Sequence, residues 1–100
     1  MGTKSNPSEY DCYAKLEPDE PYFVLMGRDP VAWLVVGMWC VFRATYADEP
    51  ERIKEARRCA RAMKQWAIDK GKQALIDKVL ETLDTLSPGF EVLETFIEAE

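Results

Sequence analysis

The first apolar positions of the chain alternate with polar ones. In residues 10–16 every second side chain is apolar or small, which is the period of a half-buried β-strand. Residues 22–26 form a second run of strand-forming side chains, and a turn at 17–21 with two prolines separates the runs. This pattern predicts a β-hairpin, preceded by a polar, disordered tail over residues 1–9.

Helix signals begin after the second predicted strand. Gly27 ends that strand, Asp29 can accept hydrogen bonds from free amides as an N-cap, and Pro30 suits the first helical position. We therefore predict a helix from Pro30 to about residues 44–46. Its core, residues 31–42, is apolar on every side and so has to be covered on every side. A buried strand is the alternative, which the length of the run and the cap disfavour.

A second helix is predicted by the same combination of an acidic cap and a proline, at Asp48 and Pro50, and extends to about residue 70. Its apolar positions, spaced by three and four, are Ile53, Ala56, Ala60, Met63 and Ala67. Residues 72–86 again place branched apolar side chains at helical spacing, until the breakers at 87–89 stop them. The pattern predicts two consecutive amphipathic helices.

The last apolar segment, residues 90–97, fits either a short amphipathic helix or an added strand. With no internal repeat and a chain of 100 residues, one domain over residues 10–100 is expected. The predicted fold class is α+β, an N-terminal β-hairpin followed by three or four helices.

Charge is distributed unevenly along the chain. Residues 50–72 hold eight Lys and Arg against three Asp and Glu, whereas the whole chain has a net charge of −5. One face of the predicted second helix carries Lys54, Arg57, Arg58, Arg61 and Lys64. We expect this basic stripe to face solvent or a partner. The acidic balance of the chain disfavours extended nucleic acid, while a small anion in a local pocket is compatible with it.

The composition removes most catalytic and metal sites. The chain has no histidine, which excludes His-based nucleophile pairs and His-ligated zinc. Its three cysteines are odd in number and widely spaced, so they indicate a reducing cytosol and neither a disulfide framework nor a zinc site. The carboxylates do not form paired motifs for Mg²⁺. We predict no enzyme, cofactor, metal, signal peptide or membrane span.

The junction between the second strand and the first helix is the best candidate for ligand binding. There the positive end of a helix and the guanidinium of Arg28 could hold an anion, and a nearby aromatic ring could stack a base. The predicted ligand-binding residues are Arg28, Tyr22, Trp33, Lys15, Arg57 and Arg61. The alternative is that Asp29 only caps the helix and Arg28 points into water. Trp39 is expected in the core.

The predicted apolar helix over residues 31–42 also indicates how copies of the chain could assemble. Few elements of a chain this short could enclose residues 31–42, and Gly37 would let a helix of another copy approach closely. We therefore expect a homo-oligomer formed near this helix. A tightly wrapped monomer is the alternative.

Two segments resemble a loose family of small phage and prophage proteins of unassigned function. They are residues 20–33, with their Pro-hydrophobic-Gly-x-Asp-Pro turn, and residues 55–66, an Ala/Glu/Arg-rich helix ending in Trp66. The resemblance implies an accessory protein in the cytosol of an infected bacterium, a setting where small oligomeric proteins sequester nucleotide second messengers of host immunity. The expected function is therefore non-catalytic sequestration of a small anionic, nucleotide-like ligand. The alternatives are a module that inhibits or adapts a host protein, and a nucleotide-cleaving enzyme.

Overall fold

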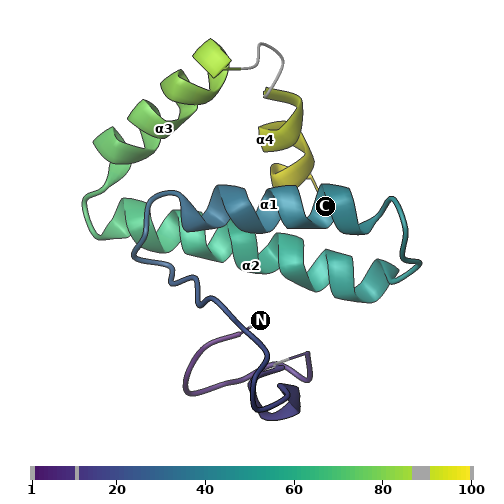
Figure 1. Cartoon of the computed structure of the whole chain (residues 1–100). Helices are drawn as coiled ribbons and strands as arrows, with labels where there is room; N and C mark the ends of the chain where they lie inside the picture. Colours follow the sequence, from purple (N-terminus) through teal and green to yellow (C-terminus); the bar gives the residue numbers. More distant parts are fainter. Residues whose placement is uncertain (1, 11, 87–90, 100) are drawn as a thin grey trace.

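The computed structural model describes residues 2–10, 12–86 and 91–99 and shows four α-helices and one short 3₁₀ helix in them (Figure 1). α1 and α2 lie side by side and antiparallel, α4 crosses over the pair, and α3 leans away from them. The 3₁₀ helix η1 lies below the pair. The elements are η1 (Tyr13–Lys15), α1 (Ala32–Arg43), α2 (Pro50–Asp69), α3 (Gln73–Leu86) and α4 (Glu91–Glu98).

The predicted β-hairpin is wrong, and the fold is all-helical instead of α+β: the described residues contain no strand. Where the first strand was expected, the chain turns into η1, in which the Lys15 N–H donates to the Cys12 carbonyl at 2.9 Å. The turn that follows is present, because the Glu20 N–H donates to the Glu17 carbonyl at 3.1 Å. Its two flanking segments, however, do not pair.

The predicted hairpin does not form because its apolar face would need to be covered. Two strands alone are marginally stable in water and need a third strand or a helix over their apolar face. Here the expected face is not buried as a whole, since Cys12 and Ala14 are exposed while Tyr10 and Leu16 are half-buried. Alternation of residue types was therefore no sign of a buried face. Asp11, which belongs to the same predicted strand, lies outside the described residues.

The N-terminal segment predicted as a tail holds a local turn. Thr3 and Asn6 exchange two backbone hydrogen bonds of 3.1 Å each, and the Tyr10 N–H donates to the Ser8 hydroxyl at 3.0 Å. Met1 of the same segment lies outside the described residues.

α1 confirms a helix at the predicted place, but it runs from Ala32 to Arg43, so Pro30 is not its first residue and Asp29 is not its N-cap. The Asp29 carboxylate accepts the Val31 N–H at 3.0 Å, so Asp29 stabilises the turn that leads into the helix. A single chain does not cover this helix on every side: among its apolar side chains Val41 is 40% exposed and Phe42 62%. α3 and α4 cover only part of α1, because α3 leans away from it.

α2 runs as predicted, and its fully buried residues are small: Ala56, Ala60 and Ala67. Small side chains let the backbones of α1 and α2 approach closely. Gly71, at φ +84°, then reverses the chain in a conformation that favours glycine, and its N–H donates to the Ile68 carbonyl at 2.9 Å. α3 begins two residues later.

The C-terminal segment, left open between helix and strand, forms the helix α4. Leu93 and Ile97 of α4 join the core between α1 and α2. The buried core cluster consists of Trp33, Leu34, Ala60, Ala67, Ile76, Leu93 and Ile97. The predicted break at 87–89 and residue 90 lie outside the described residues.

Candidate functional site

The structure does not gather the predicted anion-binding residues. Arg28 is exposed, and its guanidinium contacts the Met26 sulfur at 3.2 Å. Tyr22 packs edge-to-face on Tyr13, with 5.7 Å between the ring centres, and Lys15 ends the same 3₁₀ helix. In the described part of the chain, no hydrogen bond, ion pair or ring contact joins Arg28 to Tyr22 or Lys15.

Trp33 lies in the core and is not accessible for base stacking. Its side chain is 0% exposed, and its indole N–H donates to the Pro30 carbonyl at 2.7 Å. The ammonium of Lys64 lies 4.7 Å from the centre of the ring. The indole thus ties the start of α1 to α2. Exposed aromatic surface is found instead at Trp66, which is 53% exposed.

Arg57 and Arg61 bind the end of α4. Arg61 donates to the carbonyls of Ile97 at 2.9 Å and Ala99 at 3.0 Å, and Arg57 donates to the Ala99 carbonyl. The last carbonyls of a helix have no partner within the helix and carry its negative end, so they favour cationic donors. Much of the basic stripe expected to face solvent or a partner therefore serves as a cap for α4.

Lys64 continues the same contact. Its ammonium lies 3.3 Å from the Glu98 carboxylate and 3.8 Å from that of Glu94. Three of the five members of the stripe, Arg57, Arg61 and Lys64, spaced by about one turn on α2, thus hold one face of α4. One feature of the sequence pointed to this capping role of the stripe. The last turn of α4 contains no basic residue, so cations from another element have to bind its end.

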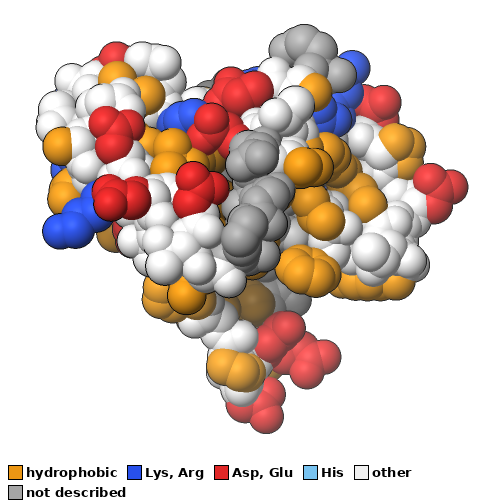
Figure 2. Space-filling model, turned by 90° about the horizontal axis from the view of Figure 1, so that it is seen from above, with side chains coloured by type: hydrophobic (Ala, Val, Ile, Leu, Met, Phe, Trp, Pro, Cys, Tyr) orange, Lys and Arg blue, Asp and Glu red, His pale blue; other side chains and the backbone are white. Residues whose placement is uncertain are grey.

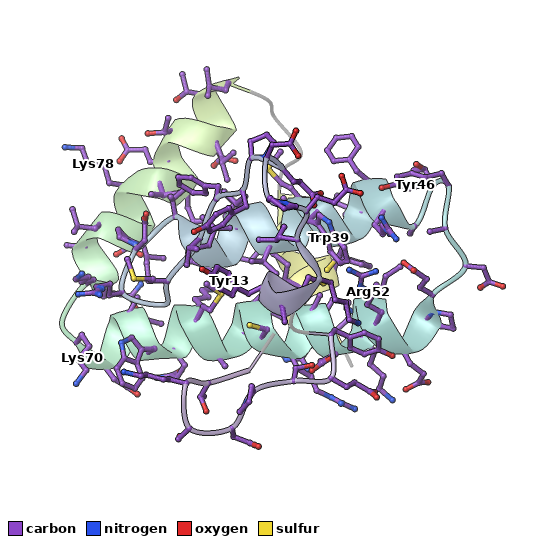
Figure 3. All side chains as sticks on the ribbon, turned by 60° about the horizontal axis from the view of Figure 1, so that its bottom comes forward. Tyr13, Trp39, Tyr46, Arg52, Lys70 and Lys78 are labelled. Carbon is purple, nitrogen blue, oxygen red and sulfur yellow. The ribbon has the colours of Figure 1, made fainter. Side chains whose placement is uncertain are left out.

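Two lysines lie near the segment that contains Arg28, at the end of α2. The Lys72 ammonium donates to the Arg28 carbonyl at 2.6 Å. Trp66 lies beside the neighbouring Gly27, whose Cβ, if it had one, would stand 3.6 Å from the indole. Lys70 places its ammonium 4.8 Å from the Trp66 ring centre, at the end of α2 (Figure 3). We name Arg28, Trp66, Lys70 and Lys72 the cationic patch.

Two arginines and a glutamate close the loop between α1 and α2. Arg43 donates to both oxygens of the Glu49 carboxylate, at 2.7 and 3.1 Å, and Arg52 approaches the same carboxylate at 3.4 Å. The hydrogen bonds from Arg43 lower the pKa of Glu49 below its usual range. With its acceptors engaged by two guanidiniums, Glu49 is held ionised.

Trp39 lies between these two arginines. Its ring centre is 5.8 Å from the Arg43 guanidinium and 5.6 Å from that of Arg52, and Figure 3 shows Trp39 and Arg52 next to each other between α1 and α2. Trp39, expected in the core, is half-buried for this reason. Within this cluster the guanidiniums of Arg43 and Arg52 pair with Glu49 and lie against the Trp39 ring, so the cluster holds the two helices together, and we name it the latch.

An apolar groove separates α3 from the start of α1. It has a volume of about 420 Å³. We name it the α1–α3 groove, and its lining residues are Pro30, Val31, Leu34, Leu75, Lys78, Val79, Thr82 and Leu83. Leu75 on its wall is 49% exposed. On the side of the molecule where α3 lies, Figure 2 shows hydrophobic side chains at the surface among acidic ones.

Two of the three cysteines, Cys40 and Cys59, are shielded by burial. Cys12 is exposed, Cys40 is buried and Cys59 is half-buried, and all three are free thiols. Burial raises the pKa of Cys40 to about 11, and it also raises the pKa of Cys59. A thiol shifted in this direction is protonated at neutral pH and unreactive.

Within the described ranges, no group of three or more metal-ligating side chains could hold an ion. None of the helices in the same ranges combines the length and the apolar character that a bilayer span requires. No protein-family model, curated protein or solved structure matches this chain. Geometry is therefore the basis on which its function has to be argued.

Proposed function

We propose that this protein is an interaction module whose α1–α3 groove binds an amphipathic helix of a partner protein. The observation that carries the proposal is the lining of the groove, in which six of eight side chains are apolar. Apolar surface that is open to water is stabilised when a partner covers it. α3 makes few contacts with the rest of the fold, and although Ile76 is buried in the core, Leu75 on the groove side of α3 is 49% exposed to such a partner.

The shape of the groove suits a helix. On α3 the lining positions recur at spacings of three and four from Leu75 to Leu83, which forms a ridge along the helix axis. Val31 and Leu34 supply the opposite wall at the start of α1. A helix laid between the walls would bury one apolar stripe against both, as in other helix-in-groove complexes.

Lys78 defines the charge of the partner. It is the charged member of the described lining, it is exposed, and it points away from α3 in Figure 3. A carboxylate beside the apolar stripe of the partner helix could pair with this ammonium, whereas a lysine there would be repelled. The partner segment is therefore an amphipathic helix that carries a carboxylate at that position.

The setting we propose is the cytosol of a phage-infected bacterium, with a host protein as the partner that is inhibited or adapted. This setting is what the resemblance of residues 20–33 and 55–66 to small phage and prophage proteins implies. The free thiols of the three cysteines are compatible with a reducing compartment.

A photo-crosslinking residue at position 79 tests the proposal. Val79 lines the groove, whereas Asp84 is exposed on the opposite side of α3 and provides the matched control position. In bacterial lysate we expect the probe at 79, and not at 84, to crosslink one protein, through a segment that is helical and amphipathic. No crosslink specific to position 79, or a crosslinked segment that is not an amphipathic helix, contradicts the proposal.

Affinity measurements then test the charge. A synthetic peptide of the crosslinked segment should bind the wild-type chain and lose most of its affinity for Val79→Glu, while Asp84→Lys binds it as well as the wild type. Lys78→Glu should weaken binding, and exchanging the peptide carboxylate for lysine should restore it. Equal affinity for all four chains would rule out the groove as the binding site.

Sequestration of a small anionic, nucleotide-like ligand is a second candidate function, and the cationic patch favours it. There the Lys70 ammonium lies 4.8 Å from the ring centre of the half-exposed Trp66, and the Lys72 ammonium donates to the backbone carbonyl of Arg28, the residue after the Gly27 that packs on the same indole. Guanidinium and ammonium groups neutralise phosphates, and an indole face can stack a base. The patch thus supports an anion at Arg28, with Trp66 in the role predicted for Trp33.

Thermal unfolding with a panel of cyclic and linear nucleotides tests this second function. A ligand that binds only the folded chain raises the melting temperature. We expect the increase to be lost in Arg28→Ala and kept in Lys54→Ala, an exposed lysine on α2. No increase with any nucleotide, or an equal increase in both variants, eliminates the patch as a nucleotide site.

A further inference from the structure

Residues 22–26 have strand-forming side chains but no secondary structure. In the part of the chain that the structure describes, no hydrogen bond uses the N–H or C=O groups of residues 22–25. Backbone groups left in this state form a template for another strand. The second strand of the predicted hairpin is thus available, and what the fold lacks is its partner.

Four of the five side chains of this segment are also exposed, Leu25 being half-buried. Phe23 is 85% exposed, Val24 62% and Tyr22 59%. Such a run of consecutive exposed apolar residues is unusual on a monomer and indicates an interaction surface. The segment carries no charge, so two copies of it could approach without repulsion.

We infer that residues 22–26 pair with the same residues of a second copy, forming an antiparallel two-stranded ladder at the centre of a homodimer. Antiparallel pairing about Val24 places Val24 opposite Val24 and Tyr22 opposite Met26. The contact is then isologous and closes with two copies. It places the dimer interface in the chain just before α1.

Charge favours this register. Glu20 and Arg28 flank the segment on its two sides, and both are exposed. With Val24 on the two-fold axis, Glu20 of each copy lies at the end where the other copy has Arg28. Opposite charges across paired strands are stabilising, and the symmetric contact makes this pairing twice.

Proline fits the same register. If Val24 occupies a hydrogen-bonded pair, the pairs at 22 and 26 are hydrogen-bonded too, whereas Pro21 and Gly27 face each other at a non-hydrogen-bonded position. The missing N–H of Pro21 is then not needed by the ladder. The Met26 carbonyl already accepts the Asp29 N–H at 3.0 Å and retains a second lone pair for the ladder.

Sedimentation velocity of the full chain over a wide concentration range tests the dimer. We expect a monomer–dimer equilibrium in the wild type. Val24→Pro removes an N–H that the ladder needs, so it should abolish the dimer. A proline at Val41 cannot serve as the control, because Val41 lies within α1 and proline breaks a helix. Val41→Thr, an exposed change on α1, serves as the control that keeps the dimer.

A charge exchange tests the register. Glu20→Arg and Arg28→Glu should each weaken the dimer about fivefold or more, because each replaces two attractive contacts by repulsive ones. The double variant restores both contacts and should dimerise like the wild type. Mixed with the wild type, it should form no heterodimer. Arg58→Glu, an exposed change on α2, controls for net charge.

Two results would overturn the inference. One is a wild-type chain that stays monomeric at every concentration. The other is a dimer that Val24→Pro leaves intact, which would move the interface elsewhere. A dimer that the double charge variant does not restore would refute the register about Val24. Far-ultraviolet circular dichroism of each variant confirms that the helices are retained.

Discussion

Ile97 of α4 lies directly over Gly37 of α1. A Cβ on Gly37 would stand 2.5 Å from Cγ1 of Ile97 and closer still to Cδ1. Ile97 is 0% exposed, so its side chain has no solvent space into which to move. The close approach that glycine permits is thus used by a helix of the same chain, and α4 is seated on the bare backbone of α1.

Gly37→Ala should therefore destabilise the fold. Overpacking of a filled core costs about 1–3 kcal/mol, while alanine gains about 1 kcal/mol of helix propensity over glycine. We expect the free energy of unfolding to fall by up to about 2 kcal/mol in urea titrations.

The matched background for this test is Ile97→Val, which removes the Cδ1 atom nearest to Gly37. In that background Gly37→Ala should cost less than in the wild type, because the closer of the two overlapping atoms, Cδ1, is gone while Cγ1 remains. An equal loss in both backgrounds, or a gain in stability from Gly37→Ala alone, would contradict the packing of α4 on α1.

Arg61→Met should release the end of α4. It removes the hydrogen bonds to the carbonyls of Ile97 and Ala99 while keeping most of the apolar stem. We expect a loss of about 1–2 kcal/mol, since bonds from charged donors are worth more than neutral ones but this end of α4 is partly open to solvent. Hydrogen exchange should accelerate in α4 and much less in α2. Arg58→Met, on the exposed face of α2, should leave both rates unchanged.

Local signals predicted most of the helices because they act within a few residues. Pro50 at the first position and spacings of three and four gave α2 its bounds, and Asp29 stabilises the entry to α1. The segment 22–26 shows where such reasoning fails. Its side chains favour a strand, yet a strand exists only if another one pairs with it, and no local pattern states which partner is present.

The candidate site was less predictable because it depends on contacts between distant residues. The spacing of Arg57 and Arg61 showed that they share a face of α2, but not that α4 covers this face, 36 residues or more along the chain. Trp33 and Trp66 are the same residue type, one in the core and the other 53% exposed. Burial decides which of them can meet a ligand, and burial is a property of the whole fold.

Glu49 should make stability depend on pH in the acid range. Arg43 lowers the pKa of this carboxyl in the folded chain, below the value of about 4.3 expected in the unfolded chain. The stabilisation is therefore fully present above the unfolded pKa and is lost as the pH falls through the folded one. Urea unfolding of wild type and Glu49→Gln should differ at pH 7 and converge in acid. A difference that stays constant with pH would contradict the ionised latch.

The cysteines should react in the order of their exposure. At pH 8 a pKa of about 11 leaves roughly one part in a thousand of Cys40 as thiolate, and burial blocks access to it as well, whereas Cys12 is exposed. Iodoacetamide followed by peptide mass analysis should label Cys12 first and Cys40 only after denaturant is added. Cys12→Ser should remove the fast phase and leave Cys40 protected. Rapid labelling of Cys40 in the native chain would show that α1 and α2 open at this point, because Cys40 reaches solvent only when the two helices separate.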